Sequence, residues 1–327
     1  ESLASKWSRQ YQGKVSNQNV AITSGCNQAF CASISSFTSE NDEVIIPTPW
    51  YFNHHMWLQM AGVKSIPLDT DANMNPIIEK AEALITDRTR AIVLVSPNNP
   101  SGAIYSNQLL QKFFDLCKSN QIRLIIDETY KDFHPNASQP HTLLENNNWD
   151  HVLTILYSFS KTYRMTGHRV GALLTSKENL IEIEKALDTF TVCPPQLGQY
   201  AANWGLNNLE AWAADRRTEI LQRAKHFSEK FQPLSAAGWS LRGCGAYFAF
   251  VEHPFEDGSN ILAPLILRDQ GILLMPGTMF YPKHNPLGSR SFRIAFANID
   301  KNKISTLLER LKDLSYQRLN SKNNMIN

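Results

Sequence analysis

Several features that would assign the sequence to a class at once are missing from its 327 residues. No apolar run approaches the length of about 18 residues that a membrane-spanning helix needs. The chain also does not open with the basic and then apolar order of a signal peptide. The formal charge of +2 at pH 7 leaves no surplus of one sign that would attract nucleic acid or an anionic membrane. We therefore predict a cytoplasmic protein that binds neither nucleic acid nor membrane.

Cysteine is scarce and scattered. The five cysteines are an odd number without a Cys-x-x-Cys pair, which argues against both a disulfide framework and a zinc site. The histidines, His54 and His55 among them, show no metal-ligand spacing, so we expect no metal. What the sequence does have is an ordinary globular mixture, with 43 % hydrophobic and 19 % charged residues, over a length typical of two domains.

Short β-branched runs alternate with amphipathic stretches through the first two thirds of the chain. The stretches at 75–85 and 106–120 repeat apolar residues at intervals of three and four, which predicts helices. Alternating strands and helices predict crossover units, and therefore a three-layer α/β/α domain with a mainly parallel sheet over residues 1–203. The predicted strands cover residues 19–23, 42–47, 63–68, 90–95, 122–127, 152–158 and 169–175.

The pattern changes after residues 193–198, where helices and short strands follow one another in a different order. This order predicts a smaller α+β domain over residues 204–327. Its predicted helices cover residues 209–231, 260–270 and 301–314, and its predicted strands lie near residues 239–243, 246–252, 272–276 and 291–298.

In a mainly parallel sheet, ligands bind beyond the carboxyl ends of the strands. Residues that directly follow successive strands are therefore expected to face one crevice. They are Ser24, Gly25, Tyr51, Asn99, Asp127, residues 158–161 and the loop before Arg169.

The sequence SFSKTYRMTGHRVG, residues 158–171, places a lysine among phosphate-binding side chains. An amine with an ordinary pKa of about 10.4 is a poor nucleophile, but desolvation or a nearby cation lowers that pKa and permits imine formation with an aldehyde. Ser158, Ser160 and Arg169 offer the hydroxyls and the guanidinium fork that bind a phosphate ester. Lys161 beside such a cradle points to pyridoxal phosphate. The alternative is an ordinary lysine beside a serine-rich turn, with Arg169 in a surface ion pair.

Two further strand ends carry polar side chains of the same chemistry. The Asp127 carboxylate ends an apolar strand and would hold the proton on the cofactor's ring nitrogen, while Tyr130 would hydrogen-bond its phenolic oxygen. Asn99, in the turn SPNNPSG, would donate to the same oxygen and to a substrate carboxylate. The alternatives are a helix N-cap for Asp127 and a plain loop for Asn99.

The remaining candidates would hold the two ends of the ligand. Free backbone N–H groups at a helix start bind phosphate, which makes Gly25, Cys26 and Asn27 candidates, although Ser24 can serve simply as an N-cap. Either Trp50 or Tyr51 would stack on an aromatic cofactor, unless both belong to the core. The planar fork of Arg293 suits an α-carboxylate, and the alternative is a buried internal salt bridge.

Taken in this order, the motifs resemble those of the class I and II pyridoxal-phosphate aminotransferases of fold type I. The resemblance spans nearly the whole chain, through TSGCNQA, PTPWYF, SPNNPSG, DETY, SFSKTYRMTGHRVG, GAYF, MPGTMF and SFRIAF. It implies a homodimeric enzyme that moves an amino group between an amino acid and a 2-oxo acid, both of them small molecules.

The resemblance also implies a role for each candidate residue. Lys161 resembles the Schiff-base lysine that shuttles the α-proton, Asp127 matches the partner of the ring nitrogen, and Tyr130 and Asn99 match the ligands of the phenolic oxygen. Arg293 matches the clamp on the α-carboxylate. The expected phosphate and ring contacts fall on Gly25, Cys26, Ser158, Ser160, Arg169 and, for stacking, Tyr51.

Two departures from the family pattern stand out. The chain opens where a preceding family segment would end, a segment that completes the partner subunit's site, so the chain looks truncated. Members specific for dicarboxylic acids can carry an arginine shortly before a Pro-Pro pair, and Asp188 falls about there. We therefore expect a neutral, aromatic or basic amino donor rather than aspartate.

Two other functions are compatible with the same residues. A carbon–sulfur β-lyase would use the same cofactor and lysine, because the substrate decides which bond breaks. An aminotransferase-like sensing domain of a transcription regulator would need a DNA-binding module ahead of it.

Overall fold

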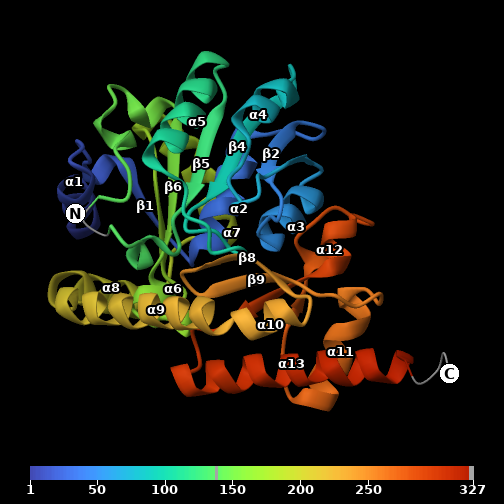
Figure 1. Ribbon diagram of the computed structural model, residues 1–327. Coiled ribbons are helices and arrows are strands. Elements are labelled where there is room, and N and C mark those ends of the chain that lie inside the picture. Colours follow the sequence, from blue (N-terminus) through green and yellow to red (C-terminus); the bar gives the residue numbers. More distant parts are fainter. Residues whose placement is uncertain (137–138, 324–327) are drawn as a thin grey trace. The chain divides into compact units, whose positions relative to one another are not determined.

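The structure is a computed structural model that describes residues 1–136 and 139–323, with side chains as far as residue 315. The chain divides into two compact units (Figure 1). The first comprises Glu1–Thr70, Asn75–Pro97 and Ile104–Thr218, and the second comprises Asp71–Met74, Asn98–Ala103 and the chain from Glu219 onward. The division falls inside helix α9 (Glu210–Lys230), whereas the sequence predicted a boundary at residue 203. An uninterrupted helix has no turn residues that would mark such a boundary.

The first unit is built on a seven-stranded sheet in the order β1-β7-β6-β5-β4-β2-β3. Strand β7 runs antiparallel to both of its neighbours and the other pairs are parallel, so the predicted mainly parallel sheet is confirmed. Every predicted strand of this sheet is present, with ends within two residues of those expected. The strands are β1 (Val20–Thr23), β2 (Glu43–Pro47), β3 (Lys64–Leu68), β4 (Thr89–Val95), β5 (Arg123–Asp127), β6 (Leu153–Ser158) and β7 (Gly171–Leu174).

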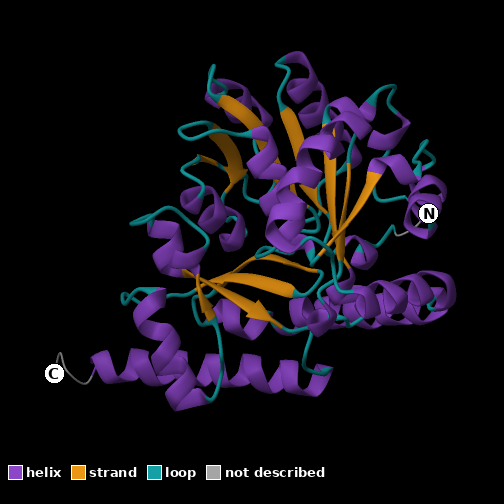
Figure 2. Cartoon of the chain, turned by 180° about the vertical axis from the view of Figure 1, so that it is seen from behind, coloured by secondary structure: helices purple, strands orange, loops and turns teal. Residues whose placement is uncertain are grey.

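Helices cover both faces of this sheet, so the predicted three layers are confirmed (Figure 2). Successive residues of a strand point to opposite faces. Val93 and Ile125 therefore pack in one core with α2, α3 and α7, while Ile92 and Leu124, equally buried, face the other side. The helices are α1 (Ser2–Tyr11), α2 (Cys26–Phe37), α3 (Phe52–Met60), α4 (Ile78–Leu84), α5 (Asn107–Ser119), α6 (Phe159–Thr162), α7 (Lys177–Thr191) and α8 (Gln196–Asn208).

The second unit has its own antiparallel sheet, in the order β10-β11-β9-β8, and is an α+β unit as predicted. Its core is aromatic, with Phe227, Trp239 and Phe292 buried together. The strand predicted at 272–276 is only two residues long, because Ile272 and Leu274 enter the core before pairing begins. The elements are β8 (Ser240–Gly245), β9 (Phe248–Glu252), β10 (Met275–Pro276), β11 (Ser291–Ala295), α10 (Gln232–Ala236), α11 (Ser259–Gln270), α12 (Pro286–Arg290) and α13 (Lys301–Asn323).

Within the described ranges, none of the helices combines the length and the apolar composition that crossing a bilayer demands.

Candidate active site

The carboxyl end of β5 presents a buried carboxylate. Asp127 is the last residue of the strand and is 3 % exposed, and its Oδ1 accepts a hydrogen bond of 2.9 Å from the backbone N–H of Thr129. Burial is the largest influence on the pKa of this carboxyl and raises it. The contacts with His54 and Thr129 outweigh burial and hold the pKa of Asp127 below its usual value. Asp127 is therefore an anion at neutral pH.

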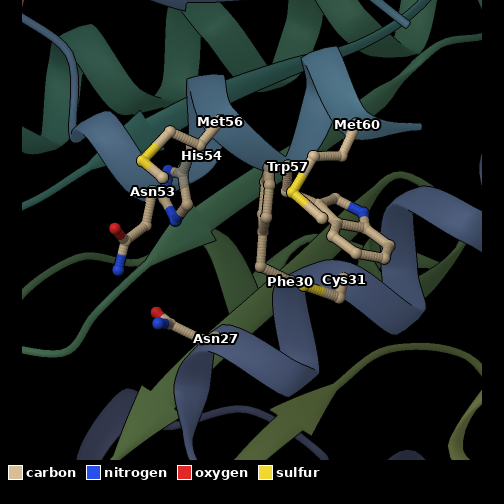
Figure 3. A pocket seen from close by; sticks show the side chains of 8 residues that line it. All are labelled: Asn27, Phe30, Cys31, Asn53, His54, Met56, Trp57 and Met60. Carbon is tan, nitrogen blue, oxygen red and sulfur yellow. The ribbon is translucent and has the colours of Figure 1, made fainter. Parts of the chain in front are cut away.

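His54, on α3, is the neighbour of Asp127 that sequence reasoning missed. Its Nε2 lies 3.2 Å from Asp127 Oδ2, within the distance of an ion pair. The imidazole ring stacks on Phe30 of α2, with the ring centres 4.0 Å apart (Figure 3). This stacking holds His54 against the carboxylate.

Tyr51 precedes α3 and directs its ring toward the same histidine. Its ring meets that of His54 edge to face, at a centre distance of 5.0 Å, and its hydroxyl accepts a hydrogen bond from Asn53. Trp50, the other stacking candidate, is buried and lies flat against His55. The Tyr51 ring thus contacts the histidine beside Asp127, whereas the Trp50 ring stacks on the next residue, His55. The sequence does indicate that His54 lies on the same side as Tyr51, because residues three apart at the start of a helix lie on one face.

Lys161 is carried by the single-turn helix α6, which directly follows β6. Strands β5 and β6 are neighbours, with Asp127 opposite Leu156, so the ends of the two strands lie side by side. The Lys161 ammonium lies 5.9 Å from the centre of the Tyr130 ring, and the lysine is half-buried. The structure thus brings Lys161 and Tyr130 together in the first unit, because the strands that they follow are neighbours in the sheet.

The turn before α2 forms a cradle with the Arg169 guanidinium. Arg169 Nη2 donates to the Ser24 carbonyl at 3.4 Å, and its Nη1 donates to the Thr166 carbonyl at 2.9 Å. Gly25 has a φ of 91°, and a Cβ at this position would lie 2.1 Å from Arg169 Nη2. Only glycine permits this approach, because a side chain would meet the guanidinium.

Strand β7 brings the serines of β6 to the same place. Gly171 of β7 pairs with Ser158 on one side and with Thr23 on the other. The Ser158 hydroxyl accepts a hydrogen bond from the backbone N–H of Ser160, and both serines are buried. Cys26 begins α2, and burial followed by the nearby Asp127 carboxylate raises the pKa of its thiol well above the usual value. Cys26 is therefore a neutral thiol, and what it offers an anion is its backbone N–H.

In the second unit the structure brings Asn99 and Arg293 together. Arg293 Nη1 donates to Asn99 Oδ1 at 2.8 Å, and its guanidinium lies 4.6 Å from the centre of the Phe248 ring. The turn of Asn99 is fixed by Asn98, whose Oδ1 accepts from both the N–H and the hydroxyl of Ser101. The Arg293 guanidinium also donates from Nη2 to Met275 Sδ at 2.6 Å and lies 5.3 Å from the centre of the Phe280 ring. Asn99 and Arg293 are thus assembled in one unit, and their roles stay predictions.

The residues of the first unit fit a phosphate ester joined to an aromatic ring. Ser24 Oγ is buried and has no hydrogen-bond partner among the residues that the structure describes, so it is available to an anion. The Gly25 turn leaves a surface at which Arg169 and the first N–H groups of α2 converge. Ten predicted residues lie in this unit: Gly25, Cys26, Asn27, Tyr51, Asp127, Tyr130, Ser158, Ser160, Lys161 and Arg169. If pyridoxal phosphate binds there, they would hold it.

Comparisons with known proteins find aminotransferases of similar sequence. An aromatic aminotransferase of Arabidopsis thaliana is 28 % identical over 277 residues, which are 81 % of this chain and 68 % of that protein. An aspartate aminotransferase of Thermotoga maritima is 26 % identical over 319 residues, which are 96 % of this chain and 80 % of that protein.

A solved structure has the same fold. The aromatic aminotransferase of Pyrococcus horikoshii superposes with a TM-score of 0.87 at 24 % identity, over 97 % of this chain and 84 % of that one. The predicted fold type I architecture is confirmed. The family described as aminotransferase class I and II matches residues 1–311. The chain therefore belongs to the class I and II aminotransferases, the family of transaminases that use pyridoxal phosphate as cofactor.

Proposed function

We propose that this protein exchanges an amino group between an L-amino acid and a 2-oxo acid, with Lys161 as the residue that binds the cofactor covalently. Bound pyridoxal phosphate supplies an aldehyde carbon and a ring that accepts electrons. The Lys161 amine would hold the cofactor through that carbon. Once the amine of the substrate has displaced it, the freed Lys161 nitrogen would move the proton at the α-carbon of the substrate.

The observation that carries the proposal is the anionic, 3 % exposed Asp127 carboxylate, which ends the strand beside the one that leads to Lys161. A carboxylate kept ionised in the protein interior holds a proton on a ring nitrogen placed against it. His54 keeps Asp127 in that state. The Tyr130 hydroxyl would donate to the phenolic oxygen, and the face of the Tyr51 ring would limit the ring's tilt.

The substrate would be held by the residues of the second unit. The Arg293 guanidinium would bind the α-carboxylate in two parallel hydrogen bonds, and the Asn99 amide would donate to the same group. Asp188 is exposed on α7 and adds a negative charge, which disfavours a second carboxylate on the substrate. We therefore propose a neutral, aromatic or basic amino donor. We also propose a cytoplasmic homodimer, by analogy with the family.

Chemical trapping tests the central step. The purified protein is incubated with pyridoxal phosphate, reduced with borohydride and digested, and the peptides are mapped by mass spectrometry. We expect one pyridoxyl group, on Lys161. A panel of amino donors followed by 2-oxo acids, monitored by the absorbance of the cofactor, then identifies the substrates. Label on another lysine, or none at saturating cofactor, would reject the assignment of Lys161.

A further inference from the structure

The segment that begins with Asp127 carries three more buried charges that have no part in the proposed function. Glu128, Lys131 and Asp132 are 1 %, 2 % and 8 % exposed. Burying a charge is costly unless neighbouring groups compensate it with an opposite charge and hydrogen bonds. The burial of three such groups within one short segment therefore requires compensating contacts, and the structure shows them.

Asp132 ties together the two ends of the turn that carries Lys161. Its Oδ2 accepts a hydrogen bond of 2.6 Å from the Tyr157 hydroxyl and another of 2.8 Å from the Thr162 hydroxyl. Tyr157 is the last residue but one of β6, and Thr162 is the last residue of α6. A single carboxylate oxygen thus contacts both sides of Lys161, through the residue directly after it and through the strand directly before its helix.

Helix α6 has little stability of its own. It is four residues long, and a single helical turn fixes many dihedral angles for very few hydrogen bonds. Its local support includes the bond from the Ser160 N–H to the Ser158 hydroxyl. The Tyr163 N–H also donates to the Phe159 carbonyl, and the Arg164 N–H to the Lys161 carbonyl. The bonds from Asp132 add a buried anchor from a different strand end.

The surroundings of Asp132 keep it ionised, so both bonds are charge-assisted. Burial raises the pKa of its carboxyl. The positive charges of Lys131 and Lys6, with the bonds from Tyr157 and Thr162, outweigh burial and lower that pKa. The Lys131 ammonium lies 3.8 Å from Asp132 Oδ1 and 5.2 Å from the centre of the Tyr157 ring. Hydrogen bonds to an ionised acceptor are stronger than neutral ones.

Glu128 is a matched acid that makes no bond to α6. Its Oε2 accepts from the Tyr11 hydroxyl at 2.5 Å, and its Oε1 lies 2.7 Å from His141 Nε2. It therefore joins the end of β5 to helix α1 and to the segment that contains His141. Glu128 and Asp132 are similarly buried in one segment. A comparison of variants at the two positions therefore distinguishes a local effect on α6 from a general loss of stability.

We propose that Asp132 is a positioning residue for Lys161, which fixes the turn of α6 through Thr162 and Tyr157 so that the amine is held in place. The importance of that amine rests on the proposed function, whereas the anchoring itself does not. A loss of the anchor lets α6 open locally, and the amine then samples directions in which it cannot attack an aldehyde.

The test uses Thr162→Val, which removes one hydroxyl, Thr162→Ser, which keeps it, and Asp132→Asn. Amide hydrogen exchange of peptides covering residues 158–164 is followed by mass spectrometry on the full chain, at equal distances below each variant's unfolding temperature. We expect exchange in Thr162→Val and Asp132→Asn to be about 10-fold to 100-fold faster than in wild type, as for the loss of a hydrogen bond to a charged group. Thr162→Ser should restore the slow exchange.

Glu128→Gln is the control, because it changes a buried acid of the same segment without touching α6. It should lower the unfolding temperature and leave exchange over 158–164 unchanged. The rate of borohydride-trapped labelling of Lys161 should fall in Thr162→Val and recover in Thr162→Ser. Equal exchange in wild type and Thr162→Val, or equal acceleration in Glu128→Gln, would overturn the proposal. An absence of label in wild type would reject the proposed function instead, and the exchange data would still decide the anchoring.

Discussion

At the scale of single residues, position along the chain predicted much of the site. Asp127 and Lys161 were expected at the carboxyl ends of their strands. In the structure Asp127 is the last residue of β5, and Lys161 lies in α6, directly after the neighbouring strand β6. His54 was not expected, because its proximity to Asp127 depends on how α3 returns to the sheet. The three-residue spacing from Tyr51 indicates a shared face, but no sequence rule states which carboxylate that face meets. The bonds of Asp132 escaped prediction for the same reason.

The charge state of Asp127 should depend on His54. The contact with His54 lowers the pKa of Asp127 against the effect of burial, so His54→Gln should raise that pKa. A raised pKa means that the carboxylate becomes protonated at a higher pH. The acid limb of the profile of kcat/KM against pH should therefore shift to higher pH. The profile is measured for the best amino donor.

His55→Gln is the control for this change. His55 stacks on Trp50 and contacts the Ser65 hydroxyl, and it does not pair with Asp127. Its acid limb should coincide with that of wild type. A His54→Gln profile that coincides with wild type would show that His54 does not set the charge of Asp127.

At the scale of elements, strands were easier to predict than the contacts between them. The β-branched runs predicted all seven strands of the large sheet, because central strands buried on both faces must be apolar. Helix α1 was not predicted, although Leu3, Ala4, Trp7 and Tyr11 bury one of its faces. Its ten residues are too few to be stable alone, and packing against the rest of the unit decides that it forms.

The approach of β7 to the start of α2 is a contact between elements that one glycine permits. A Cβ at residue 171 would lie 2.5 Å from the carbonyl carbon of Gly25 and 2.6 Å from the backbone nitrogen of Cys26. Gly171→Ala should therefore push the two elements apart, destabilise the protein by about 1–3 kcal/mol and weaken the binding of pyridoxal phosphate. Urea unfolding measures the first effect, and a fluorescence titration with the cofactor measures the second.

Gly167→Ala provides the comparison four residues earlier. A Cβ at residue 167 would meet nothing within 4 Å, so its stability should stay within about 0.5 kcal/mol of wild type, with the same affinity for the cofactor. If Gly171→Ala behaves like Gly167→Ala, the closeness of β7 and α2 does not shape the phosphate site.

At the scale of the whole molecule, the fold class predicted for each of the two units is confirmed. The division between the units lies after Thr218, whereas the sequence placed it after residue 203. Both units have the architecture expected from the order of their elements. The second unit, however, also takes in Asp71–Met74 and Asn98–Ala103, which are short loops of the first two thirds of the sequence. A composition pattern read along the chain assigns such loops to their sequence neighbours, because contacts with distant residues leave no trace in it.

The buried acids should make the stability of the whole chain depend on pH in a defined direction. The pKa of Asp132 is lower in the folded protein than the value of 3.8 for an unperturbed carboxyl. Its ionised form therefore stabilises the folded state at pH values above 3.8, and this contribution is lost as the pH falls through the folded pKa. Asp132→Asn should thus be destabilised near neutral pH by about 3–5 kcal/mol, as for a broken buried pair, and its difference from wild type should shrink in acid.

Circular dichroism melts between neutral pH and about pH 3 test this expectation against a surface acid, since the unperturbed carboxyl titrates within that range. Asp115 is exposed on α5, where it accepts a hydrogen bond from Gln111. Asp115→Asn removes the same formal charge and should differ little from wild type at any pH, because exposed pairs contribute little. A difference between Asp132→Asn and wild type that stays constant into acid would mean that the shape of the Asp132 side chain, rather than its charge, stabilises the fold. The charge-assisted bonds to Tyr157 and Thr162 would then lose their energetic basis, because a neutral acceptor would serve equally well.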